Sequence, residues 1–69
     1  MRRIASPLLI LPDGQVLRQQ VVEILQGRVE CYYPLTEELP FTEWFDRSVV
    51  LRYNEDNLCQ AFCDDAPIE

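Results

Sequence analysis

The strongest local signal in this sequence is Pro12-Asp13-Gly14, which separates the apolar segments 8–11 and 16–17. Asp-Gly between apolar segments is typical of a β-hairpin turn, because glycine accepts the positive φ that tight turns require. Residues 15–26 follow without an internal glycine or proline and carry four β-branched side chains. They favour a strand, with a helix as the alternative for this glutamine-rich stretch. The sequence therefore predicts a hairpin near its start.

A second turn is predicted at residues 26–28, and the segment after it alternates between apolar and polar positions. One face carries Val29, Cys31, Tyr33 and Leu35, and the other carries Arg28, Glu30 and Tyr32. Period two with a polar opposite face is typical of a half-buried antiparallel strand. Residues 49–53 alternate in the same way and predict another strand, which ends at the turn-forming residues 54–57.

The segment from Thr36 to Ser48 breaks this pattern. Phe41, Trp44 and Phe45 are spaced i, i+3, i+4, which favours one or two helical turns within residues 36–47. Residues 58–63 fit either a strand or a helix, and we favour the strand because a four-residue turn joins antiparallel strands compactly. Residues 64–69 are acidic and contain a proline, so we expect a frayed tail.

Together these signals predict one all-β domain over residues 1–69. We expect an antiparallel meander or small sandwich of four or five strands, with a short helical insertion around residues 36–47. A chain of 69 residues buries only about 60% of the surface that its unfolded form exposes, so its core is thin. Self-association is one way to bury more apolar surface.

The order of the motifs resembles a known module. An apolar strand, the "PDG" turn at residues 12–14, a valine-rich strand and the "GRV" turn at residues 27–29 follow one another. Residues 8–51 are in this respect similar to the small β-sandwich (composite) domain that precedes the barrel of amidohydrolase-type metal-dependent hydrolases. Those hydrolases bind metal largely through histidines of the barrel, and this chain has no histidine and no barrel. The resemblance thus implies only an all-β accessory module and no catalytic residue.

Charge and composition argue against several classes of function. Six arginines against twelve acidic groups give a net charge of −6, which repels a phosphate backbone, so we expect no nucleic-acid partner. The chain has neither histidine nor lysine, which disfavours catalysis and predicts a protein that is not an enzyme. No apolar run approaches the roughly 20 residues of a membrane helix, and Pro7 interrupts the apolar start of the chain. We expect a cytoplasmic protein without a membrane partner.

Three cysteines, Cys31, Cys59 and Cys63, are an odd number for a disulfide scaffold and fit a reducing compartment. On a strand Cys59 and Cys63 would lie roughly 13 Å apart, too far for a disulfide, whereas on a helix they would lie one turn apart. An alternative function is a small-ligand or metal-binding accessory protein that uses these three residues. The simpler interpretation is that they are packing residues, and we expect no cofactor.

The most plausible functional residues are Phe41, Trp44 and Phe45, because aromatic side chains are common anchors of protein interfaces. They also suit a role in covering the domain's own sheet. We expect a non-enzymatic β module that acts by self-association, as a homo-oligomer, or by binding a protein partner. An unpaired sheet edge and the apolar surface near Trp44 would form the contact.

Overall fold

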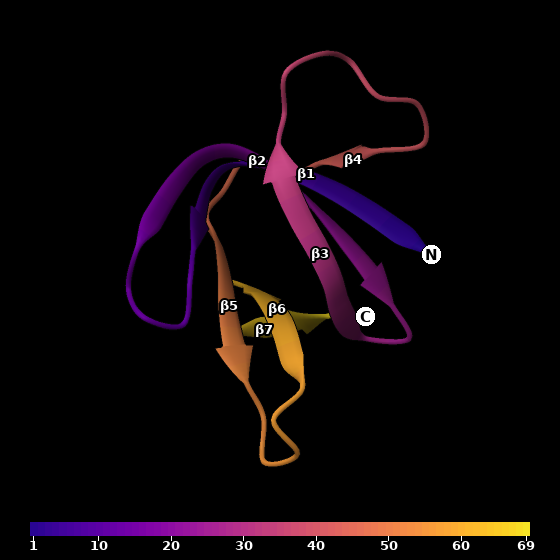
Figure 1. Ribbon diagram of the computed structural model, residues 1–69. Helices are drawn as coiled ribbons and strands as arrows, with labels where there is room; N and C mark the ends of the chain where they lie inside the picture. The colour runs from indigo at the N-terminus through magenta and orange to yellow at the C-terminus, as the bar shows by residue number, and fades with distance from the viewer.

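The computed structural model describes residues 1–69 and consists of strands, turns and loops (Figure 1). The seven strands are β1 (Arg2–Ile10), β2 (Val16–Leu25), β3 (Arg28–Pro34), β4 (Glu43–Trp44), β5 (Val49–Tyr53), β6 (Cys59–Cys63) and β7 (Ala66–Ile68). The mainly-β prediction is confirmed, as is the strand favoured for residues 58–63. The helical insertion predicted at residues 36–47 is wrong: only the short strand β4 forms there. No helix long and apolar enough to cross a membrane is present.

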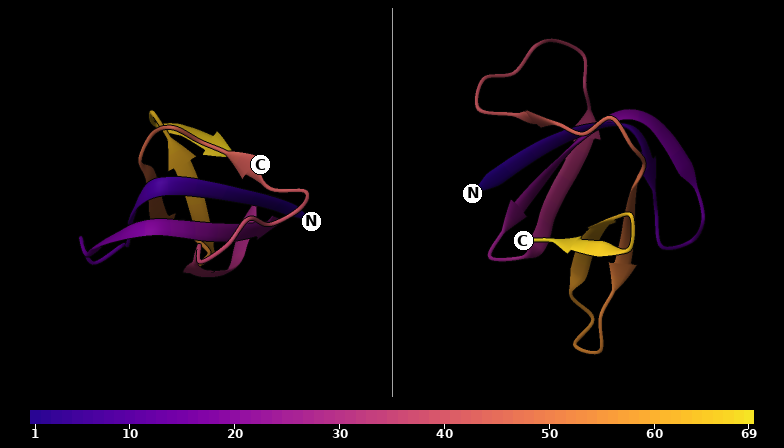
Figure 2. Two further views of the ribbon diagram at one scale, coloured as in Figure 1. Left: turned by 90° about the horizontal axis from the view of Figure 1, so that it is seen from above. Right: turned by 180° about the vertical axis from the view of Figure 1, so that it is seen from behind.

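The strands form one mixed sheet in the order β3-β2-β1-β5-β6-β7, with β4 beside β1. The pairs β1–β2, β2–β3, β5–β6 and β6–β7 are antiparallel, but β4 and β5 both run parallel to β1. The purely antiparallel meander is therefore wrong. After β3 the chain crosses to the far side of β1, so β4 and β5 line up along the edge of β1 that β2 leaves free. Figure 2 shows β5, β6 and β7 on one side of the curved β1–β2 hairpin.

Half-way along the β1–β2 hairpin, the face that points toward the core changes to the opposite face of both strands. Ile4 and Leu9 both lie in the core, although residues five positions apart face opposite sides of a regular strand. The pairing register is the same before and after the one missing pair, Pro7 and Gln19. Gln19 has a φ of 50°, and proline lacks a backbone donor, so both strands turn over at this point. This bend lets one hairpin wrap around the core.

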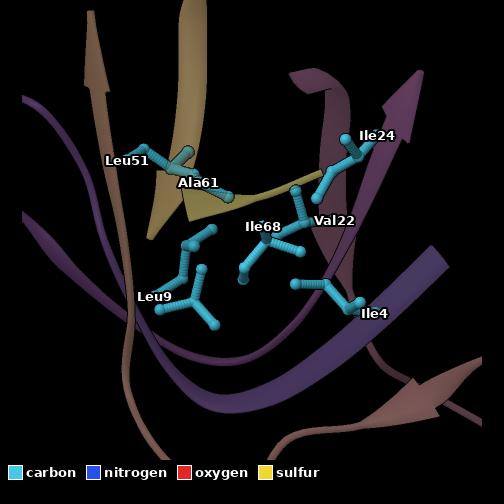
Figure 3. Packing of buried hydrophobic residues seen from close by; sticks show 8 residues of the cluster. Ile4, Leu9, Val22, Ile24, Leu51, Ala61 and Ile68 are labelled. Carbon is cyan, nitrogen blue, oxygen red and sulfur yellow. The ribbon is translucent and has the colours of Figure 1, made fainter. Parts of the chain in front are cut away.

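The core is an aliphatic cluster between the hairpin and strands β5 to β7 (Figure 3). Its buried members are Ile4, Leu9, Val22, Ile24, Val49, Leu51, Ala61 and Ile68. Burying each large aliphatic side chain contributes roughly 1.5–3 kcal/mol, so this cluster is the main source of stability.

Residues 64–69 are not a frayed tail. Asp64 and Asp65 both have positive φ values, 53° and 64°, and form the two-residue turn of a hairpin that pairs β7 with β6. Such turns require positive φ at both central residues, which aspartate tolerates better than most residues. The hairpin places Ile68 in the core.

A β-bulge changes the predicted alternation of β3. The register shifts between Glu23 and Ile24, and Glu30 is the extra residue on β3. Residues opposite each other on paired strands share a face. Val29 and Tyr32 oppose the core residues Ile24 and Val22, whereas Cys31 and Tyr33 oppose Glu23 and Val21. Val29 therefore lies on the opposite face from Cys31 and Tyr33, although the alternation predicted one face for all three. The turn predicted at residues 26–28 is confirmed, since Gln26 and Gly27 have φ values of 52° and 77°.

Candidate protein-binding face

The three aromatic residues singled out in the sequence do not share one face. Phe45 packs partly buried against the core, and its backbone N–H donates to the carbonyl oxygen of Ala5 at 2.8 Å. Trp44, its neighbour on an extended segment, points to the opposite side and is 56% exposed. Phe41 is 96% exposed. The predicted helical spacing is lost because this segment pairs with β1 instead of bonding to itself.

Trp44 lies on the outer face of the β1–β2–β3 layer, the face that points away from the core. Ala5 and Val21 are buried there although neither belongs to the core cluster. A hollow of about 260 Å³ opens beside Trp44. It is lined by Ala5, Leu35, Glu38, Leu39, Thr42 and Trp44. The loop of residues 35–42 therefore borders the outer face at Ala5 and encloses an apolar depression with Trp44.

Both ends of this 35–42 loop are fixed to the sheet. At its start the backbone N–H of Leu35 donates to the carbonyl oxygen of Gln19 at 2.8 Å. Near its end the Arg3 guanidinium donates to the carbonyl oxygen of Pro40 at 3.2 Å. Arg2 then donates twice to the Glu43 carboxylate, at 2.6 and 2.9 Å, and this bond lowers the pKa of Glu43. The loop is thereby held out from the sheet, as Figure 1 shows.

Glu23 is the centre of a polar cluster on the same outer face. Tyr33 Oη donates to Glu23 Oε2 at 2.6 Å, Arg3 Nε donates to the same oxygen at 3.2 Å, and Cys31 Sγ lies 3.6 Å from Oε1. The hydrogen bond from Tyr33 is the main cause that lowers the pKa of Glu23, and the same bond raises the pKa of Tyr33. The cluster fixes Arg3, which in turn supports the loop at Pro40.

The chemistry of this cluster suits support better than catalysis. Partial burial, followed by the neighbouring Glu23 carboxylate, raises the pKa of the Cys31 thiol, so the thiolate nucleophile is disfavoured. A general acid or base works best when its pKa is close to the ambient pH. The pKa of Glu23 is shifted below its ordinary value, which moves it further from neutral pH.

The three cysteines are free and lie on different parts of the fold. Cys31 is on the outer face of β3, and Cys59 and Cys63 are the first and last residues of β6. Burial raises the pKa of Cys59. No three cysteine or acidic side chains are grouped closely enough to hold a metal ion. The residues proposed for a metal site are therefore not brought together.

The negative charges are distributed unevenly. Five of the six arginines form ion pairs, and the sixth, Arg18, forms none. The carboxylates without an ion pair belong to Asp13, Glu37, Glu38, Glu55, Asp56 and Glu69. Two of them, Glu37 and Glu38, lie in the loop beside Trp44. The apolar depression therefore has an acidic rim.

Of the residues that line the hollow, the sequence pointed to Trp44 but not to Leu35 and Leu39; Phe41, which it also pointed to, lies in the same loop without lining the hollow. Their signal was two leucines within a segment otherwise rich in proline and acidic residues. We call Leu35, Leu39, Phe41 and Trp44 the aromatic loop face.

Comparisons with known proteins add no relative. No protein-family model matches the sequence, and neither a curated protein nor a solved structure matches it. The resemblance of residues 8–51 to the amidohydrolase β-sandwich domain stays a prediction.

Proposed function

We propose that this chain is a non-enzymatic module that binds a protein partner through the aromatic loop face. The observation that carries the proposal is the state of Phe41, which is 96% exposed and has a φ of 55°. Left-handed backbone costs a residue with a Cβ atom about 1–2 kcal/mol, and an exposed phenyl ring forgoes the burial that would offset it. In a domain with so small a core, an exposed ring on a strained backbone lowers stability without a gain in the fold itself. A partner that covers the Phe41 ring explains why it is there.

The charge around the face favours a partner other than a second copy. In a symmetric dimer the same patch meets itself, so Glu37 and Glu38 of one copy would approach those of the other. Like charges at close range oppose association, whereas a partner with lysine or arginine around an apolar pocket would be attracted. The proposed partner is therefore a protein with a basic rim.

The free sheet edges make a smaller contribution to this proposal. β7 has three residues and contains Pro67, and β4 has only two. The third free edge, β3, is interrupted by the bulge at Glu30 and ends at Pro34. Prolines, bulges and short strands are the features that block strand addition at an edge. Binding through side chains of the loop is therefore favoured over extension of the sheet.

Site-specific crosslinking tests the proposal in cells that make the protein. p-Benzoylphenylalanine in place of Phe41 should yield a discrete adduct with another protein, and in place of the exposed Leu25 it should not. Trp44→Ala and the double variant Glu37→Lys, Glu38→Lys should each abolish the adduct at position 41 while the circular dichroism stays unchanged. Equal adducts at both positions, no adduct at all, or adducts made only of copies of this chain would each contradict the proposal.

A further inference from the structure

A second apolar depression lies on a different part of the molecule. It has a volume of about 280 Å³ and shares no residue with the aromatic loop face. It is lined by Leu11, Pro12, Asp13, Tyr32, Leu51, Tyr53 and Cys59. These residues come from the β1–β2 turn and from strands β3, β5 and β6, so four separate segments build it. We call it the tyrosine groove.

Two exposed rings and an apolar floor give the groove its shape. Tyr53 is 63% exposed and Tyr32 is 42% exposed, whereas Leu51, which also lines the groove, is fully buried. The thiol of Cys59 has a raised pKa because it is partly buried, so it remains a neutral side chain at the floor. Flat aromatic rings with hydroxyl groups at their tips can stack on an apolar ligand and donate hydrogen bonds at its edges.

The charge at the groove has one sign. Asp13 is the only charged residue that lines it, and it forms no ion pair. Glu55 and Asp56, in the turn that connects Tyr53 to Cys59, also have no ion pair. The arginines on the lining strands, Arg28 and Arg52, are already paired with Glu30 and Asp65. The groove therefore attracts a cation.

We propose that the tyrosine groove binds an extended, proline-containing peptide segment that carries an arginine or a lysine. A polyproline II backbone makes no internal hydrogen bonds, so its carbonyl oxygens are free to accept from the tyrosine hydroxyls. Its proline rings stack on aromatic side chains, and its restricted backbone loses little entropy on binding. The basic side chain pairs with Asp13.

The size of the groove agrees with this ligand. Pockets for drug-sized molecules usually enclose roughly 300–1,000 Å³. A groove of about 280 Å³ is at the lower limit of that range and suits one or two side chains of a peptide that continues beyond it. This second site is independent of the proposed function, since it needs neither Phe41 nor Trp44.

Titration of the isotope-labelled full chain with synthetic decapeptides, followed by NMR, tests the proposal. The probe is a proline-rich decapeptide with one arginine. Two matched controls replace that arginine by glutamate or all prolines by glycine. The probe should shift the amide signals of Asp13, Tyr32, Tyr53 and Cys59, and each control should bind about tenfold more weakly or not at all.

Variants of the chain localise the effect. Tyr53→Ala should weaken probe binding about tenfold, whereas Tyr53→Phe should retain most of it, because stacking survives the loss of the hydroxyl. Asp13→Asn keeps the side-chain oxygen that accepts from the N–H of Gln15, so the turn is preserved, and it should weaken binding and reduce its salt dependence. Phe41→Ala should bind the probe as tightly as the unchanged chain, which separates this site from the aromatic loop face.

Three outcomes would overturn the proposal. One is the absence of signal shifts at the groove with millimolar probe. Another is equal affinity for the proline probe and its glycine control. The third is that tetramethylammonium shifts the same amides as strongly as the peptide, which would identify a site for small organic cations instead.

Discussion

The two faces of the β1–β2–β3 layer are covered in different ways. On the inner face Ile4, Val22 and Ile24 are sealed by strands β5 to β7, whose side chains interlock with them (Figure 3). On the outer face Ala5 and Val21 are also buried, but Ala5 borders an open hollow, and the nearby Trp44 of β4 and Phe41 of the 35–42 loop are largely exposed. Paired strands bring several aliphatic side chains into one closed cluster. A loop that is fixed mainly at its ends buries few side chains, so its apolar residues stay exposed to solvent. We therefore expect stability to depend on the inner face and recognition on the outer one.

The largest expected effect is on the inner face. Leu51→Ala removes a fully buried side chain and should lower the free energy of unfolding by about 2–5 kcal/mol, which for a domain this small approaches its whole stability. The same substitution at the exposed Leu58 should cost less than about 1 kcal/mol. Urea denaturation followed by circular dichroism measures both. Similar costs at the two leucines would show that the strand cluster is not the main source of stability.

A sharper test uses neighbours on one strand. Val21 and Val22 are both fully buried, but Val22 belongs to the core cluster, whereas Val21 is on the outer face and does not. Val22→Ala should cost about 2 kcal/mol, because the surrounding strands cannot close around the lost methyl groups. Val21→Ala should cost about 1 kcal/mol, because Val21 lies outside the core cluster and its loss leaves that cluster intact. A larger loss at Val21 would reverse the ranking of the two faces.

The turns and several strands were predictable from local sequence. Asp13-Gly14 lies in the first turn, where the backbone N–H of Gly14 donates to the carbonyl oxygen of Leu11 at 2.9 Å. Gln26-Gly27 forms the second turn, and residues 49–53 form β5 as expected. These features depend on a few adjacent residues and on the preference of glycine for positive φ, so the sequence alone is enough to indicate them.

The features that failed depend on distant partners. The spacing of Phe41, Trp44 and Phe45 fits a helix, and only the pairing of β4 with β1 decides against it. The acidic residues 64–69 fit a tail, and only the place that the core offers to Ile68 makes them a hairpin. The candidate site was divided for the same reason: strand pairing turned Phe45 inward and left Trp44 and Phe41 outside.

A smaller effect concerns the polar support of the outer face. Tyr33→Phe removes the hydrogen bond to Glu23 and should lower the free energy of unfolding by about 1–1.5 kcal/mol near neutral pH. Because the bond lowers the pKa of Glu23 in the folded state, its contribution is present above the ordinary glutamate value of about 4.3 and is lost as the pH falls through the folded pKa.

The same bond raises the pKa of Tyr33, so the contribution is also lost at alkaline pH, as the pH rises beyond the ordinary tyrosine value of about 10 and through the raised folded value. The denaturation midpoints of the Tyr33→Phe variant and the unchanged protein should therefore converge at both extremes of pH. A difference that does not change with pH would mean that the hydroxyl acts through packing and not through Glu23.

The smallest expected effect is at the displayed ring itself. Phe41 has a left-handed backbone, which asparagine adopts more readily than phenylalanine does. Phe41→Asn should therefore raise the free energy of unfolding by about 0.5 kcal/mol, whereas Phe41→Ala, which keeps the backbone cost, should leave it unchanged within about 0.5 kcal/mol. Both changes remove a ring that contributes almost no buried surface, so neither should destabilise the domain. A loss of more than about 1 kcal/mol in either variant would show that the ring supports the fold, and the division between a stabilising inner face and a recognising outer face would fail at its most exposed residue.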